Sequence, residues 1–318
     1  EWGRLMSYLE QSTRYISYYS RFGGRYRYYR DPEIMESSFG ARYIGDMDRI
    51  FDTYAHLVPQ MQDFVREQFP KHPDDGDFVY RQAVKAKAFD ALRGLLPAAS
   101  LSNVGIYGTG QAYEALLLRM RSHPLPESRY YADLMLRELR KVIPSFLERV
   151  DREDRGVVWS EYLQETREDT ADVVAALFPE GSIVDPSPTV RLVDFDPEGE
   201  VKMIASMMYP HSTMSEDQLE RRVAGMNHED RMAVARAYVG DRRNRRHKPG
   251  RALERPFYRF DVLVDYGAFR DLQRHRMLSM DWQNLSPHHG YISSPLVNAA
   301  GMGPVYEEAM ERSAALYD

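Results

Sequence analysis

Two spacings of hydrophobic positions recur along the chain and predict different elements. Apolar residues three and four positions apart mark the buried face of a helix, as in Met47, Ile50, Phe51, Tyr54, Leu57, Met61 and Phe64. Strict alternation, which puts every second side chain on one face, predicts a strand at 258–266, and a further strand is predicted at 190–195. Gly267 ends this alternation, and helical spacing resumes at Phe269, Leu272 and Arg276, which places Arg274, His275 and Arg276 on the predicted helix. This stretch therefore predicts a strand that leads into a helix.

Helical spacing also predicts several other elements. One helix is predicted from 86 to its end at 97, one long amphipathic helix runs through 136–150, and another occupies 201–208. The segment 151–187 is acidic and then contains prolines, which predicts a connector with one short helix at 171–178.

Composition narrows the function classes. The 318 residues are 43% hydrophobic and 28% charged, as expected of a soluble globular protein with one large or two ordinary domains. Cysteine is absent, which excludes a disulfide scaffold, a thiolate zinc site and a cysteine nucleophile. The net charge of -6 argues against a general nucleic-acid binder. With no apolar run of membrane-spanning length and no visible signal peptide, we expect a cytoplasmic protein without a membrane segment.

The candidate chemistry begins with Arg274, His275 and Arg276, just after the predicted strand and the start of the helix. A guanidinium can hold a phosphate through two parallel hydrogen bonds, and an imidazole donates or accepts near neutral pH. By itself, such a short basic run is more typical of a solvated helix face. We expect no metal site, because the adjacent His288 and His289 point apart on any regular element.

The wider sequence around these residues resembles the flavin-dependent (FAD-dependent) thymidylate synthases. Their signature is Arg-His-Arg-x-x-Ser, and the match runs without a gap through Glu254, Tyr258, Phe260, Arg270, Arg274, His275, Arg276 and Ser279. In that family the signature holds FAD, so the resemblance implies that the matching residues from Arg270 to Ser279 bind this cofactor. The family also has a histidine shortly before this segment, and His247 is the candidate for it, although it is out of register.

Residues 7–15 resemble the segment that follows the signature in these enzymes, Ser-x-x-Glu-x-Ser-x-Arg-Tyr. In the family its glutamate, serine and arginine contact the nucleotide dUMP. The resemblance therefore implies substrate binding by Glu10, Ser12, Arg14 and Tyr15.

This first copy of the motif departs from the family at several positions. Trp2 and Gly3 stand where the signature has arginine and histidine. Gln111 occupies the place of an arginine that grips the nucleotide, and a lost charge-assisted contact of this kind costs about 1.5–3 kcal/mol. The glycines of 105–110 fit either a tight turn or a phosphate cradle at a helix N-terminus.

Two further stretches bear on the nucleotide. Residues 88–97 resemble the family element Ala-Arg-Glu-x-x-Arg-x-x-Leu-Pro, with Phe89 in place of the first arginine. On spacing alone, Asp90 and Arg93 form an ordinary helix ion pair. Near the signature, Asp271 stands where the family uses a glutamine on the nucleotide.

The resemblance implies a tandem repeat of two degenerate copies. Copy 1 covers 1–150 and keeps the nucleotide segment, 151–187 is a linker, and 188–318 is a truncated copy 2 that keeps the flavin signature. It further implies an α/β (α+β) fold, rich in helix, in which two thymidylate-synthase-complementing-like units each hold a small mixed or antiparallel sheet. One composite site would form between the copies, and a homo-oligomer, a dimer of tandem chains, would mimic the tetramer of the family.

If the family chemistry is retained, the protein performs reductive methylation of dUMP or a related pyrimidine nucleotide. The resemblance implies FAD as hydride donor, the folate methylenetetrahydrofolate as one-carbon donor and NADPH as reductant, with no side chain acting as a covalent nucleophile.

Two alternatives remain open on the sequence. The departures at Gln111 and Asp271 favour a flavin- or nucleotide-binding paralogue without catalysis. A nucleic-acid-contacting scaffold would use the Tyr- and Arg-rich tract 1–30 and the basic cluster 242–248, but the acidic net charge makes it the weakest hypothesis. The competing prediction for 1–30 is a helix with packed tyrosines and solvated arginines.

Overall fold

The computed structural model describes residues 5–178, 189–275 and 277–317. Contacts divide the chain into unit 1, which combines Glu1–Ser182 with Asp265–Asp318, and unit 2, Ile183–Val264. Within the described residues, each unit is helix-rich and holds one two-stranded antiparallel sheet. The predicted helix-rich fold with small antiparallel sheets is confirmed. The two-copy organisation stays a prediction, because compact units report contacts rather than repeats.

The sheet of unit 1 joins the N-terminal strand to a helix. Strand β1 (Met6–Glu10) pairs with β2 (Val104–Gly108), so that Met6 lies opposite Gly108 and Glu10 opposite Val104. Thr109 caps α4 (Gly110–Arg121), which packs against Met6. Gly110 faces the ring of Phe146, which a Cβ at this position would overlap. Close packing therefore explains this glycine.

Helices α4, α5 (Pro126–Leu139) and α6 (Pro144–Leu147) share a small core. The single long helix predicted through 136–150 is wrong. Pro144 starts α6, and a proline disfavours the helical conformation of the preceding residue, so α5 ends before it.

The segment predicted as a connector with one short helix is also more ordered than expected. It holds one π-helical turn, η2 (Glu153–Val157), and the 20-residue helix α7 (Val158–Leu177). Ser160 and Arg167 donate hydrogen bonds of 3.3 Å and 2.6 Å to the backbone carbonyls of Leu118 and Ser122. These bonds fix the start of α7 against the end of α4.

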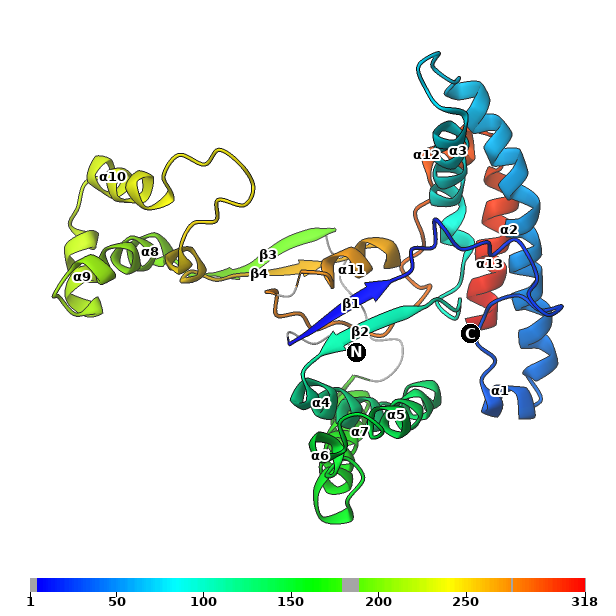
Figure 1. Ribbon diagram of the computed structural model, residues 1–318, viewed down its shortest axis with the longest axis horizontal. Helices are drawn as coiled ribbons and strands as arrows, with labels where there is room; N and C mark the ends of the chain where they lie inside the picture. The colour runs from blue at the N-terminus through cyan, green and yellow to red at the C-terminus, as the bar shows by residue number, and fades with distance from the viewer. Residues whose placement is uncertain (1–4, 179–188, 276, 318) are drawn as a thin grey trace. The chain divides into compact units, whose positions relative to one another are not determined.

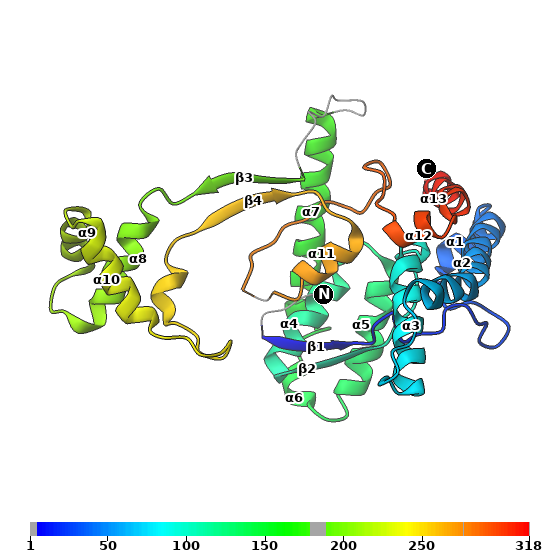
Figure 2. The same cartoon turned by 90° about the horizontal axis from the view of Figure 1, so that it is seen from above.

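The largest core of unit 1 lies between helices from both ends of the chain. Its elements are α2 (Gly40–Gln68), α3 (Asp77–Leu92), the 3-10 turn η1 (Arg93–Leu95), α12 (Pro295–Ala299) and α13 (Gly303–Tyr317), while the short helix α1 (Pro32–Glu36) precedes α2 and has no buried residue. Helix α13 lies beside α2 (Figure 1, Figure 2), and Arg42 donates a 2.5 Å hydrogen bond to the carbonyl of Ala315. The predicted apolar face of α2 is confirmed, since its residues from Met47 to Met61 are buried.

The tyrosine-rich tract after β1 is not the helix predicted for 1–30. Gly23 and Gly24 adopt positive φ values of 56° and 79°, which no helix contains. Tyr26 and Tyr28 instead bury their rings around Phe51, with ring centroids 5.2 Å and 5.5 Å from its ring. Rings buried in this way are not available for stacking on nucleic-acid bases.

Carboxylates of α2 accept hydrogen bonds from the hydroxyls of these tyrosines. Tyr26 donates to Asp52 at 2.5 Å, and Tyr28 donates to Asp48 at 2.9 Å. Burial, and then the bond to Asp48, raises the pKa of Tyr28 to about 12. The Tyr28 hydroxyl therefore stays protonated, and its ring stays packed, at any ordinary pH.

Unit 2 contains β3 (Val190–Phe195), α8 (Gly199–Met208), η3 (Tyr209–His211), α9 (Glu216–Ala224), α10 (His228–Val239), η4 (Arg251–Glu254) and β4 (Tyr258–Val262). The predicted strand at 190–195 and helix at 201–208 are confirmed. The second strand is shorter than predicted, because Asp265 already caps the next helix, α11 (Tyr266–Leu272). All residues of β3 and β4 are exposed, including apolar ones on both faces.

No helix among residues 5–178, 189–275 and 277–317 combines the length and apolarity needed to cross a membrane.

The packing around Phe51 predicts a stability difference. Phe51→Ala should lower the free energy of unfolding by about 3–5 kcal/mol, because it leaves a cavity among the tyrosine rings. Phe78→Ala is the control, since Phe78 is 65% exposed, and it should change stability by less than about 0.5 kcal/mol. Urea denaturation followed by circular dichroism measures both. Equal effects of the two substitutions would contradict the assigned core.

Candidate functional site

An ion pair joins the two segments that the resemblance assigns to nucleotide and flavin. Glu10 ends β1, and its carboxylate contacts the guanidinium of Arg270 on α11. Both side chains are largely hidden from solvent, at 27% and 29% exposure. Residues 260 positions apart in the sequence therefore meet at one point in unit 1.

The surroundings of Arg270 are unusual for an arginine. Burial, and then the nearby cation of Arg274, lowers its pKa, whereas Asp271 acts in the opposite direction. The guanidinium carbon also lies 5.6 Å from the ring centroid of Tyr266, a cation–π distance. Pairing with Glu10 favours the charged form and keeps this partly buried cation compensated.

A second charge cluster involves the arginine of the nucleotide segment. The side chain of Arg14 donates to Asp90 on α3 at 3.2 Å, and Arg93 of η1 lies 3.4 Å from the same carboxylate. A Cβ added at Gly267 would lie 3.6 Å from a terminal nitrogen of Arg93. Arg93 therefore approaches the N-terminal end of α11, the helix that carries Arg270.

Short-range hydrogen bonds hold the nucleotide segment in shape. The hydroxyl of Ser12 accepts from the backbone N–H of Arg14 at 3.3 Å. Gln11 is tied to the approach to β2, because Ser102 donates to its carbonyl at 2.9 Å and Asn103 to its side chain at 2.8 Å. This turn positions Arg14, while Tyr15 stays 70% exposed.

The signature residues follow the end of α11 rather than lying on the helix. The helix ends at Leu272, and the residues after it form turns. Arg274 is 68% exposed and pairs with Asp271 at 2.8 Å, and His275 and Ser279 are exposed as well. Arg276 lies outside the described residues. The predicted extension of the helix through the signature is therefore wrong.

Gln111 lies away from the ion pair. It sits in the first turn of α4, which follows the end of the sheet where Met6 pairs with Gly108. Glu10 lies at the other end of the sheet, where it pairs with Val104. Four residue steps of strand separate these ends by about 13 Å. Gln111 and Glu10 are thus not brought together within this chain.

His247 belongs to unit 2, where its own loop holds it. Its two ring nitrogens lie 3.4 Å from the backbone nitrogen of Arg243 and 3.1 Å from the side-chain nitrogen of Asn244. The side chain of Arg242 donates to its backbone carbonyl at 2.8 Å. These contacts give His247 a structural role in shaping the basic loop.

Asp90 and Arg93 are the residues whose place in the site was not predicted from spacing. The helix ion pair between them is present, as expected, but the additional contact to Arg14 depends on the tertiary fold. The signal that could have found them is their position in the motif-like segment 88–97. Across the described ranges, no group of three or more His, Asp or Glu side chains could hold a metal ion.

A double-mutant cycle tests the ion pair. Arg270→Gln should lower the free energy of unfolding by about 1–3 kcal/mol, because it leaves the half-buried carboxylate of Glu10 without its partner. Adding Glu10→Gln should restore part of this loss. The control Arg274→Gln removes an exposed charge and should cost less than about 1 kcal/mol. Additive effects of the substitutions at positions 10 and 270 would rule out the coupling.

Comparison with known proteins supports the resemblance for the first part of the chain. Residues 3–145 match the family described as thymidylate synthase complementing protein. This match covers most of the predicted copy 1, and the tandem repeat stays a prediction.

Relatives of similar sequence are found over nearly the whole chain. A UPF0159 protein of Chlamydia pneumoniae is 39% identical over 312 residues, which cover 98% of this chain and 58% of the relative. UPF0159 proteins of Chlamydia muridarum and Thermoplasma acidophilum are 35% and 29% identical, over 97% and 98% of this chain and 58% and 65% of their own length. The chain thus spans about three fifths of the curated relatives that it matches, and its residues 3–145 carry a domain similar to the thymidylate synthase complementing proteins.

Proposed function

We propose that this protein binds FAD and a pyrimidine nucleotide and catalyses the reductive methylation of dUMP or a related nucleotide with methylenetetrahydrofolate. The observation that carries the proposal is the contact of Glu10 with Arg270. It places the nucleotide-like segment of the N-terminal domain beside the helix that leads into the flavin-like signature.

The charges around this contact suit phosphate-bearing ligands. Asp90 is shared between Arg14 and Arg93, so this cluster carries one net positive charge. Arg274 and His275 lie in exposed turns after α11 and keep free access to solvent. Guanidinium groups hold phosphates through paired, charge-assisted hydrogen bonds. The donor set therefore fits the phosphates of a nucleotide and of FAD.

In the proposed reaction, reduced FAD supplies hydride, and NADPH regenerates it. The residues of this chain bind and orient the partners. Arg14 and Arg93 hold the nucleotide phosphate, and Glu10, fixed by Arg270, accepts hydrogen bonds from the nucleotide. Orientation of this kind accounts for a large part of catalysis when the cofactor supplies the reactive group.

We further propose a homodimer of this chain. The supporting observation lies in unit 2, where the side chains of Phe195, Tyr258 and Phe260 on β3 and β4 are 49%, 64% and 52% exposed. A two-stranded ribbon is marginal alone, and clusters of exposed apolar side chains mark interaction surfaces.

Cofactor binding is tested by reconstitution of the full chain with FAD, followed by desalting and visible absorbance spectroscopy. The wild-type protein should retain flavin. Arg274→Gln should weaken FAD binding about tenfold or more, because it removes a charge-assisted phosphate contact. Arg312→Gln, an exposed arginine paired with Glu308, is the matched control and should leave binding unchanged. A wild-type chain that retains no flavin would contradict the proposal.

A binding protein without catalysis is the second candidate, and one observation favours it. Gln111 is neutral and follows the Gly108 end of β2, about 13 Å along the strands from the Glu10 end, so the chain itself provides no arginine at that family position. Anaerobic kinetics separates the candidates. Oxidation of reduced flavin that depends on dUMP and methylenetetrahydrofolate supports the enzyme, whereas flavin binding without such oxidation supports the binding protein.

A further inference from the structure

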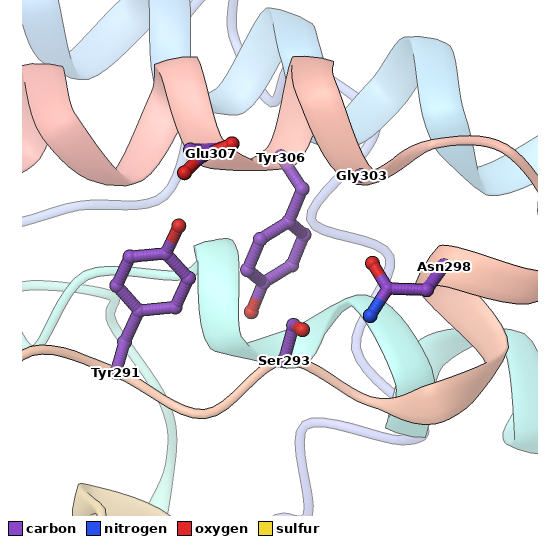
Figure 3. A pocket seen from close by; sticks show the side chains of 6 residues that line it. All are labelled: Tyr291, Ser293, Asn298, Gly303, Tyr306 and Glu307. Carbon is purple, nitrogen blue, oxygen red and sulfur yellow. The ribbon is translucent and has the colours of Figure 1, made fainter.

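A polar pocket in unit 1 is lined by residues outside the candidate site. It has a volume of about 160 Å³ and lies between α12, α13 and the segment before them (Figure 3). Its lining is Tyr291, Ser293, Asn298, Gly303, Tyr306 and Glu307. None of these residues belongs to the predicted flavin or nucleotide sites, so the pocket needs its own explanation.

Tyr306 is the buried polar group of this pocket. The residue is 2% exposed, and Figure 3 shows its hydroxyl directed toward Ser293. The hydroxyl also lies against Gly94, where a Cβ would overlap it. A hydroxyl can both donate and accept a hydrogen bond, so the Tyr306 hydroxyl can bond to an occupant of the pocket.

The electrostatic character of the pocket is negative. Glu307 supplies a carboxylate that forms no ion pair within the described parts of the chain, and none of the six lining residues is cationic. Burial, followed by the carboxylates of Glu307 and Glu311, raises the pKa of Tyr291. Burial, followed by Tyr291 and Asp265, raises the pKa of Tyr306 to about 12. These groups disfavour an anion and favour a cation.

The rings of the pocket fit the same kind of ligand. The centroids of Tyr291 and Tyr306 are 6.0 Å apart, with their planes tilted by 43°. The faces of tyrosine rings attract organic cations within about 6 Å. The side-chain amide of Asn298 and the hydroxyl of Ser293 add acceptors for N–H donors.

We propose that this pocket binds a small organic cation through a guanidinium or primary ammonium group. The carboxylate of Glu307 pairs with the charge, and the Tyr306 hydroxyl and Asn298 oxygen accept its N–H groups. The volume is below the several hundred Å³ typical of sites for drug-sized ligands, so the pocket accommodates the cationic end of a molecule rather than a nucleotide. The proposal is independent of the proposed flavin chemistry, because it uses none of the same residues.

Ligand-observed NMR titration of the full chain tests the site with ethylguanidinium as the probe and its neutral analogue, N-ethylurea, as the comparison. The cation should bind saturably and at least about tenfold more tightly than the urea. Glu307→Gln should weaken cation binding about tenfold, and Tyr306→Phe should weaken it several-fold. Glu311→Gln makes the same charge change one turn further along α13, outside the pocket lining, and should alter affinity less than about twofold.

Three results would overturn the proposal: no saturable binding of ethylguanidinium, equal affinity for N-ethylurea, or equal effects of the substitutions at 307 and 311. Circular dichroism of each variant checks that it is folded, and Glu307→Gln, at an exposed helix position, keeps the test usable if Tyr306→Phe disturbs the core.

The cationic group that the pocket binds can belong to a free amine or to an arginine or lysine side chain of a second copy of this chain. Sedimentation velocity with and without saturating ethylguanidinium distinguishes the two sources. Dissociation of a self-associated chain by the cation assigns the pocket to a protein side chain, and binding without a change in association state assigns it to a free compound.

Discussion

The pairing of Glu10 with Arg270 is the constraint on which the candidate site depends. Separating these largely hidden charges would leave each without its partner, so the ion pair favours contact between the end of β1 and helix α11. This contact reaches across 260 positions and brings a C-terminal helix back to the N-terminal domain. The segment that resembles the flavin signature lies about 260 positions after the segment that resembles the nucleotide motif, and the tertiary contact brings the two regions together.

The charged side chains around that pair are of two kinds: some are neutralised by a partner in the protein, and others are exposed enough to bind a ligand. Arg270 is half-buried and already paired, so it positions Glu10. Arg14 shares Asp90 with Arg93, and these side chains are all more than two fifths exposed, so solvent weakens their mutual attraction. A phosphate that offers two oxygens to each guanidinium competes well with such a shared carboxylate. The exposed pairs are therefore the groups that a ligand can engage without leaving a charge buried and unpaired.

Periodicity predicted the elements whose packing is local. The apolar face of α2, the strand β3 and helix α8 lie where their spacing placed them. Periodicity failed where a single residue or a contact between distant segments determines the local structure. Pro144 divides a helix-like run, and positive φ values at Gly23 and Gly24 turn a tract that looked helical. In the candidate site, resemblance to family motifs pointed to Glu10, Arg14 and Arg270 individually. The spacing of residues along the chain does not say which distant residues meet, so it could not predict the contacts of position 10 with 270 or of Arg14 with Asp90.

One short turn lies between the Arg14–Asp90–Arg93 cluster and the pocket around Tyr306. In η1, Arg93 directs its guanidinium to Asp90 and toward Gly267, and the next residue, Gly94, lies against the Tyr306 hydroxyl. A side chain at 94 would displace the tyrosine, and a shift of the turn would move Arg93 away from the shared carboxylate. Consecutive residues of this turn thus contact both the Asp90 carboxylate and the Tyr306 hydroxyl, and the backbone of 93–95 links the two positions.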